Sequence, residues 1–419
     1  MYGPAAGACR PAPTQSPDFG FESDVGRQAR RRVRPGRHRA SRQLWSWASG
    51  YDDLSYQPDT RSNKALQPTA SLDIEADAAA ERRSLGGFVE ETLTVQERSE
   101  RWGLGPRPEL GLIDKLNGML RGLGAKQPPA LPDLTQSSLL FAASDYSGQH
   151  AEAPYQAYSI VLADLAGSQK WETSRRSIRA RWLADGRRLS YKGLRDRHQE
   201  AALAPFLRAA DFIPGLLLTV LVDRGIQNMF HLVEGERDED SIGPFAKWPR
   251  GSLEKLLRVV HLLSLLVAGL SRPGQDLLWI TDEDEIAANE QRLTELVLGF
   301  SNVASHYLTH SLGHLRVGTT RSDTGSRDVE DFAAIPDLAA GAAAEAFGRF
   351  HGMTGWPSPP GIVVPSLAGT SGKATIIMSW YARDQHASLK RLVYLIDRDR
   401  DTGKQRVSAL TVHPSGFTA

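Results

Sequence analysis

Apolar runs and periodic apolar positions from residue 111 onward predict a chain that alternates between strands and helices. Short apolar runs bounded by turn residues predict strands at residues 138–145, 155–165, 187–194, 215–224, 276–281 and 315–320. Apolar positions at helical spacing predict helices at residues 111–124, 196–211, 252–270, 284–311 and 330–347. Three early strands followed by strand and helix alternation predict an α/β fold, a mixed sheet with helices on its faces.

Residues 351–419 have a different pattern, which predicts a small β-meander. Apolar runs predict strands at residues 374–382, 391–399 and 406–414, with the turn RDTGK between the last two. This meander could form an appended sheet or extend the main one. The predicted organisation is therefore a main domain at residues 111–350 and a β-rich extension at residues 351–419.

Residues 1–110 lack sustained periodicity and mix Pro, Gly, Ser, Arg and Gln, with a dense basic run at residues 27–43. A segment of this composition cannot bury enough apolar surface to offset the entropy of ordering it, so we predict disorder. The basic run could serve as a flexible polyanion-binding arm, but a dispensable tail or a mis-set start codon is the favoured interpretation.

Composition narrows the possible classes of protein. Cys9 is the only cysteine, which excludes an intrachain disulfide or a cysteine metal cluster and predicts a reducing, cytoplasmic location. The longest apolar stretch, residues 256–270, contains Arg258 and His261 and is too short to span a bilayer, so we expect a core helix and no membrane partner. The formal net charge is +1, so a nucleic-acid partner has to be argued from local clusters.

Acidic residues follow several of the predicted strands. Asp145, Asp223 and Asp282 each come directly after a strand, and Asp337 lies inside an Ala-rich predicted helix. The carboxyl ends of strands in an α/β sheet face the crevice where ligands bind. Converging carboxylates repel one another unless a hard cation holds them, so the pattern favours Mg²⁺ or Mn²⁺. Turns also favour Asp, so any one of these acids alone is more often structural.

The order of these motifs resembles the RNase H-like nuclease superfamily, and most closely the bacterial domain-of-unknown-function family 3800. Asp145-Tyr-Ser-Gly148 is similar to the family's Asp-Glu-Ser-Gly, and IPDLAAGA (335–342) to its late Ala-Asp-Leu-hydrophobic-Ala-Gly helix. VLVDR (220–224) and WITDED (279–284) resemble its strands that end in acids. The resemblance covers residues 137–347 and implies an RNase H-like mixed sheet flanked by helices.

The resemblance also implies site residues. Asp145, Asp282 and Asp337 match the catalytic, metal-binding acids, with Asp284 as an alternate ligand. Lys192 resembles a family lysine on the third strand that would stabilise phosphate charge, although a solvated lysine is an equal alternative.

The chain departs from the family pattern at three positions. Tyr146 and Gln149 stand where the first motif carries acids, and Pro336 precedes the last Asp in place of Ala or a similar residue. Fewer acids imply weaker metal affinity or lost catalysis, which favours a silent module.

A basic segment between Lys170 and Arg197 interleaves cations with Trp171, Trp182 and Tyr191. Neutralising phosphates and stacking bases would need this combination, whereas a basic surface helix with inward-packed aromatics is the alternative. The candidate nucleic-acid contacts are Arg175, Arg176, Arg179, Arg181, Arg187, Arg188 and Arg195.

Other kinds of site have weaker support. No Gly-x-Gly-x-x-Gly turn or phosphate loop of the Gly-Lys-Ser type occurs, and no Gly-x-Ser-x-Gly elbow supports a serine hydrolase. His306, His310 and His314 have a spacing that could suit Zn²⁺, but Gly313 is expected to end their helix.

Two functions follow from the sequence. The first is a Mg²⁺- or Mn²⁺-dependent nuclease, or a protein derived from one, that hydrolyses phosphodiester bonds of DNA or RNA. The alternative is a catalytically inactive RNase H-like module that binds nucleic acid or a partner protein in a defence or mobile-element system.

Overall fold

A computed structural model describes residues 101–126, 130–230, 242–323, 325, 327–354, 361–363, 370–382, 387–399 and 402–412. The disorder predicted for residues 1–100 lies outside these residues. Residues 101–110, also predicted to be disordered, are instead packed onto the domain. Trp102 is buried, its indole Nε1 donates a hydrogen bond to Asn117, and a short 3₁₀ helix, η3 (Pro108–Leu110), follows. The prediction failed because a few apolar anchors suffice to dock a segment without periodicity.

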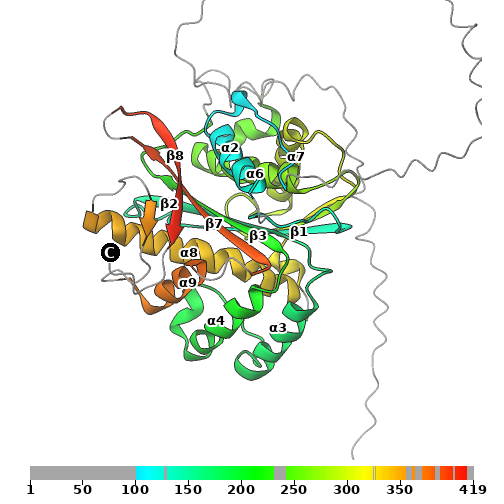
Figure 1. Cartoon of the computed structure of the whole chain (residues 1–419), viewed down its shortest axis with the longest axis vertical. Coiled ribbons are helices and arrows are strands. Elements are labelled where there is room, and N and C mark those ends of the chain that lie inside the picture. The colour runs from blue at the N-terminus through cyan, green and yellow to red at the C-terminus, as the bar shows by residue number, and fades with distance from the viewer. Residues whose placement is uncertain are drawn as a thin grey trace, which may run out of the picture.

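The described strands form one mixed sheet (Figure 1). Its strands are β1 (Leu139–Ser147), β2 (Tyr155–Ala163), β3 (Gly215–Asp223), β4 (Asp276–Thr281), β5 (Leu315–Thr319), β6 (Gly361–Val363), β7 (Leu389–Arg398) and β8 (Gln405–Val412). They lie in the order β5-β4-β1-β2-β3-β7-β8-β6. The strands β1, β2 and β3 are antiparallel neighbours, whereas β4 runs parallel to β1 and β5 parallel to β4.

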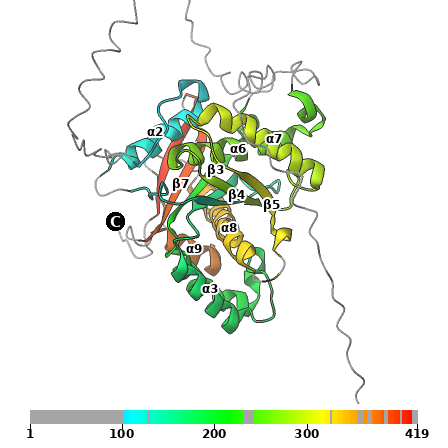
Figure 2. The ribbon, with the colours of Figure 1, turned by 90° about the vertical axis from the view of Figure 1, so that its right-hand side faces the viewer.

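Helices cover both faces of the sheet, as the α/β prediction requires (Figures 1 and 2). One face, the α6 face, carries α2 (Leu112–Gly124), α6 (Arg250–Leu270) and α7 (Glu290–Tyr307). The other, the α8 face, carries α3 (Gln169–Trp182), α4 (Arg197–Ala210), α8 (Asp328–Thr354) and α9 (Gly372–Ala382). Since strand side chains alternate between faces, each strand contributes to two separate apolar layers.

The helix α6 confirms the expected core helix. Nearly all of its side chains from Leu253 to Leu270 are buried, which explains why its sequence is apolar on every side. Arg258 is also buried, where it pairs with Glu254 one turn earlier. No helix in the described part of the chain is long and apolar enough to cross a membrane.

Two predicted strands are wrong. Residues 187–194 contain no strand, and the 3₁₀ helix η4 (Lys192–Arg195) occupies their end, because only Leu189 and Leu194 of this polar segment reach the core. Residues 374–382 form α9, in which Ala374, Ile377, Met378 and Tyr381 are buried at helical spacing. β-branched and aromatic residues made this helix resemble a strand.

The predicted C-terminal meander is therefore not a separate sheet. The strand β7 pairs in parallel with β3, and β8 pairs antiparallel with β7, so both strands extend the main sheet. The strands β7 and β8 are thereby part of the same sheet that carries Asp145 and Asp282.

Candidate acidic centre

The strands β1 and β4 bring two of the predicted acids to the same end of the sheet. These strands are parallel, and their register pairs Ser144 with Thr281, so Asp145 and Asp282 come next along neighbouring strands. Alternate residues of a strand point to the same face, so Phe141 shares a face with Asp145 and Ile280 with Asp282. Both Phe141 and Ile280 pack in the apolar layer beneath α8. Asp145 and Asp282 therefore emerge on the α8 face, at the carboxyl ends of the strands.

The helix α8 contributes the third acid, Asp337. This helix packs across β1, β2 and β3, and Pro336 does not interrupt it. The backbone N–H of Tyr191 donates a hydrogen bond to Asp337 Oδ2 over 2.6 Å. Figure 2 shows α8 running beneath the sheet. Residues almost 200 positions apart thus lie close enough for the charges of Asp337 and Asp282 to act on Asp145, and we call these three residues the acid centre.

Electrostatics show that the three carboxylates influence one another. Burial raises the pKa of Asp145 well above its ordinary value, and the charges of Asp337 and Asp282 raise it further. Burial is also the main cause that raises the pKa of Asp337, with a further contribution from Asp282. Hydrogen bonds from the N–H groups of Tyr146 and Tyr191 only partly offset these effects on the two pKa values. The negatively charged forms of Asp145 and Asp337 are therefore less favourable here than in water.

Two cations lie near the acid centre. Arg188 Nη2 is 3.8 Å from Asp282 Oδ1, and its charge lowers the pKa of both Asp145 and Asp337. Lys192 is exposed on η4 rather than on a strand, but its charge also acts on Asp337 and lowers its pKa. Lys192 therefore lies near the acid centre, as predicted, but it is carried by η4 instead of a third strand.

Asp284 does not join the acid centre. Its carboxylate pairs with the Lys255 ammonium on α6 and accepts the N–H of Ile286. Because α6 covers the opposite face of the sheet, the prediction of Asp284 as an alternate ligand is not supported by this geometry. Glu283 likewise pairs with Arg321, and Glu285 lies near Lys255, so these acids have local protein partners.

Tyr146 also lies on the α6 face. Its hydroxyl is 2.7 Å from Ser144 Oγ and 3.0 Å from Thr281 Oγ1, and the Lys255 ammonium lies 4.8 Å from its ring centroid. Gln149 is exposed in the following turn. Because the side chain of residue 146 points away from Asp145, its replacement by tyrosine removes no carboxylate from the acid centre.

The acid centre has the donor chemistry of a divalent-cation site without being a preformed cage. Carboxylate oxygens are the ligands that Mg²⁺ and Mn²⁺ prefer, and three carboxylates lie here beside the cations Arg188, Lys192 and Lys373. Within the described residues, however, no three His, Cys, Asp or Glu side chains are arranged to hold a metal ion. The residues fit a hard cation in chemistry, charge and place in the fold.

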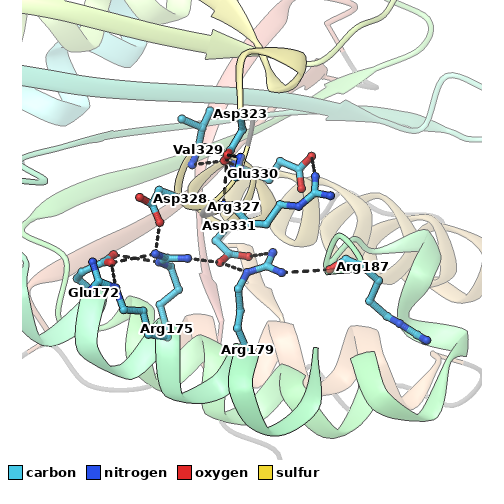
Figure 3. A network of polar contacts seen from close by, with 12 residues as sticks. Glu172, Arg175, Arg179, Arg187, Asp323, Arg327, Asp328, Val329, Glu330 and Asp331 are labelled. Carbon is cyan, nitrogen blue, oxygen red and sulfur yellow. Dashed lines mark hydrogen bonds and ion pairs between the residues drawn. The ribbon is translucent and has the colours of Figure 1, made fainter. Parts of the chain in front are cut away.

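The basic segment divides into structural and surface arginines (Figure 3). Arg175 is buried and contacts Glu172, Asp328 and Asp331, and Arg179 donates from both Nε and Nη2 to Asp331, each over 2.6 Å. These ion pairs fasten α3 to the start of α8, so the predicted role of Arg175 and Arg179 as nucleic-acid contacts is not supported.

The other five arginines retain exposed surface. Arg176 pairs with Glu172 while largely exposed, Arg181 lies over the Trp182 ring, and Arg187 pairs with Asp185 and Asp196. Arg195 is exposed on η4. Of these five arginines, Arg188 is the one that forms an ion pair with the acid centre, through Asp282.

The histidine triplet is dispersed. The helix α7 ends at Tyr307, so His306 and His310 do not share a helical face. His310 contacts Ser271 Oγ, and His314 contacts Asp276 at the opposite end of the strands. The described residues thus contain no zinc-binding arrangement of this triplet.

The sequence did not predict the residues that hold Tyr191, the hydrogen-bond donor to Asp337, in place. The Tyr191 hydroxyl donates to Glu345, and the Lys373 ammonium donates to the Tyr191 carbonyl over 2.8 Å and lies over its ring. The ring of Tyr191 packs directly against Gly341 of α8. A larger residue would not fit there, since a Cβ at position 341 would lie 2.3 Å from Tyr191 Cγ. The Ala- and Gly-rich character of this helix was the one available signal.

Comparisons with known proteins give no further identification. No family model, no curated protein and no solved structure matches this chain.

Proposed function

We propose that this protein is a metal-dependent nuclease that hydrolyses phosphodiester bonds of DNA or RNA at the acid centre. The observation that carries the proposal is the convergence of Asp145, Asp282 and Asp337 from β1, the end of β4 and α8, where burial and then the charges of Asp337 and Asp282 raise the pKa of Asp145. Carboxylates that repel one another are uncommon in a purely structural role, and they attract a hard cation.

The arrangement of the strands supports the RNase H-like resemblance. The strands β3, β2 and β1 form an antiparallel unit, and β4 and β5 add to the β1 edge in parallel. The first and fourth strands then lie side by side, which is what an RNase H-like centre built on these two strands needs. The face occupied by Tyr146 removes one reason to regard the centre as degenerate.

Each residue of the centre has a proposed role. Asp145, Asp282 and Asp337 would hold Mg²⁺ or Mn²⁺, which when bound would activate a water and stabilise charge on the phosphate. The N–H groups of Tyr146 and Tyr191 each hold one carboxylate oxygen of Asp145 and Asp337, which fixes the orientation of both side chains. Lys192 adds positive charge beside Asp337, where it would favour an anionic substrate.

The proposed partner is nucleic acid, contacted by exposed arginines around the centre. Arg181, Arg187, Arg188 and Arg195 retain exposed surface for this role, whereas the predicted contact Arg176 is left out of it because its guanidinium pairs with Glu172. A cytoplasmic location, argued from the single cysteine, belongs to the same proposal.

A second candidate function is an inactive RNase H-like module that binds nucleic acid or a partner protein. The position of Arg188 beside Asp282 favours it, because a guanidinium can neutralise an acid centre that holds no metal. The lack of a preformed three-ligand group among the described residues favours it too.

A cleavage assay separates the two functions. Labelled single- and double-stranded DNA and RNA are incubated with the protein in Mg²⁺ or Mn²⁺, beside an Asp145→Ala/Asp337→Ala variant and an Asp284→Asn control. We expect cleavage by the parent and the control and none by the double variant. Absence of cleavage by the parent on every substrate would refute the nuclease.

A further inference from the structure

We propose that Arg188 binds a phosphate group of the nucleic-acid backbone at the acid centre, and that it is distinct in this respect from the other arginines of the basic segment. The inference rests on the proposed function, since it names the residue through which that centre would recognise its substrate.

The backbone on both sides of Arg188 is anchored. The Arg187 carbonyl accepts a hydrogen bond from Arg179 Nη1 over 3.3 Å, and Arg179 is itself held by Asp331 at the start of α8 (Figure 3). On the other side, Leu189 is completely buried in the layer beneath α8. Because both neighbours are fixed, Arg188 is directed toward the acid centre by structure rather than by a flexible loop.

The guanidinium of Arg188 has donors that the protein does not use. Its Nη2 is 3.8 Å from Asp282 Oδ1, which is longer than a hydrogen bond. Its Nε is buried, and within the described residues it has no hydrogen-bond partner. A buried donor without an acceptor is unfavourable, so a shift of the guanidinium that brings Nε to a ligand oxygen would relieve this cost.

A phosphate group matches these donors better than a further carboxylate would. The planar fork of arginine presents parallel N–H groups, which phosphate oxygens accept in pairs. The side chain of Arg188 remains about one-third exposed, so an incoming ligand can reach it. Asp145, Asp282 and Asp337 would repel a phosphodiester, and Arg188 is placed where its charge opposes that repulsion.

The other arginines lack this combination. Arg175 and Arg179 are taken up by Asp331, and Arg187 pairs with Asp185 and Asp196. Arg176 has a mostly exposed side chain that pairs with Glu172, which makes it a suitable control on the same segment.

The test is binding of a fluorescent oligonucleotide, single- or double-stranded, in Ca²⁺ at several salt concentrations, with its intactness checked on a gel. The proteins are the parent, Arg188→Ala, Arg188→Lys and Arg176→Ala, each with its melting temperature measured. We expect Arg188→Ala to weaken binding about tenfold and to reduce the salt slope by about one, as loss of one phosphate contact requires. Arg188→Lys should restore the slope but only part of the affinity, and Arg176→Ala should resemble the parent.

The outcomes distinguish this inference from the proposed activity. Unchanged affinity and slope in Arg188→Ala overturn the inference even if the parent cleaves, and so does failure of the parent to bind any oligonucleotide. Tighter Mn²⁺ binding by Arg188→Ala with unchanged oligonucleotide binding makes Arg188 a counter-ion only, which also overturns it. Weakened binding by Arg188→Ala in a parent that never cleaves supports the inference and refutes only the nuclease.

Discussion

The backbone N–H of Tyr191 donates a hydrogen bond to Oδ2 of Asp337, so a loop segment orients an acid on α8. Further hydrogen bonds hold both the side chain and the backbone of Tyr191. Its hydroxyl donates to Glu345, and its carbonyl accepts from Lys373. Since Lys373 lies on α9, the C-terminal part of the chain helps to set the geometry of the acid centre.

Gly341→Ala tests this support. Alanine normally stabilises a helix relative to glycine, but a Cβ at this position would lie 2.3 Å from Tyr191 Cγ. Tyr191 would have to move, so we expect a loss of about 1–3 kcal/mol in unfolding free energy together with reduced cleavage. Gly118→Ala is the matched control, because no atom lies within 4 Å of its added Cβ, and it should be neutral or slightly stabilising. Equal effects of the two substitutions would contradict the packing described here.

Asp145→Asn tests the electrostatics of the acid centre in metal-free buffer. Burial and two acidic neighbours raise the pKa of Asp145 above that of an unfolded chain. Below the unfolded-state pKa of about 4, Asp145 is protonated in both the folded and the unfolded state, so its ionisation does not reduce the free energy of unfolding. As pH rises through the raised folded pKa, the unfolded state releases its proton more easily and stability is lost.

The variant lacks this titration, so its melting temperature should exceed that of the parent at pH 8, with a difference that shrinks toward pH 4. Glu152→Gln, at an exposed position, should show no such pH-dependent difference. A variant less stable than the parent at pH 8 would mean that the negative charge of Asp145 is fully compensated.

Asp331→Asn tests whether the buried arginines are structural. Arg175 and Asp331 are both almost completely buried, and Asp331 also binds Arg179. Removing one partner of a buried ion pair leaves an uncompensated charge, so we expect a loss of about 3–5 kcal/mol in a urea titration. Arg176→Ala should change stability by less than about 0.5 kcal/mol, because its pair with Glu172 is exposed. A small effect of Asp331→Asn would show that the network adds little to the docking of α3.

Sequence reasoning predicted the sheet well where strands are long apolar runs. The strands β3 and β4 agree closely with prediction, because complete burial on both faces demands continuous apolar residues. It failed at residues 187–194, whose structure depends on long-range contacts with α8 rather than on local periodicity. It failed again at α9, where a short apolar run does not distinguish a buried helix from a strand.

The candidate acids could be predicted because strand ends place side chains in a crevice. Their division between faces could not, because Asp282 and Asp284 are only two positions apart, just beyond the end of a strand. Only the pairing of Asp284 with Lys255 on α6 assigns it to the other face. The same holds for Arg188, which the sequence could not separate from its basic neighbours.

Calorimetric titration with Mn²⁺ tests the acid centre most directly. The titrated proteins are the parent, Asp282→Asn, Asp284→Asn and the Asp145→Asn/Asp337→Asn double variant, each checked for folding. We predict saturable binding by the parent and by Asp284→Asn, binding at least tenfold weaker in Asp282→Asn, as about 1.4 kcal/mol of lost interaction would give, and none in the double variant. No saturable binding by the parent, or equal binding by all four proteins, would contradict the assignment of Asp145, Asp282 and Asp337 as a metal site.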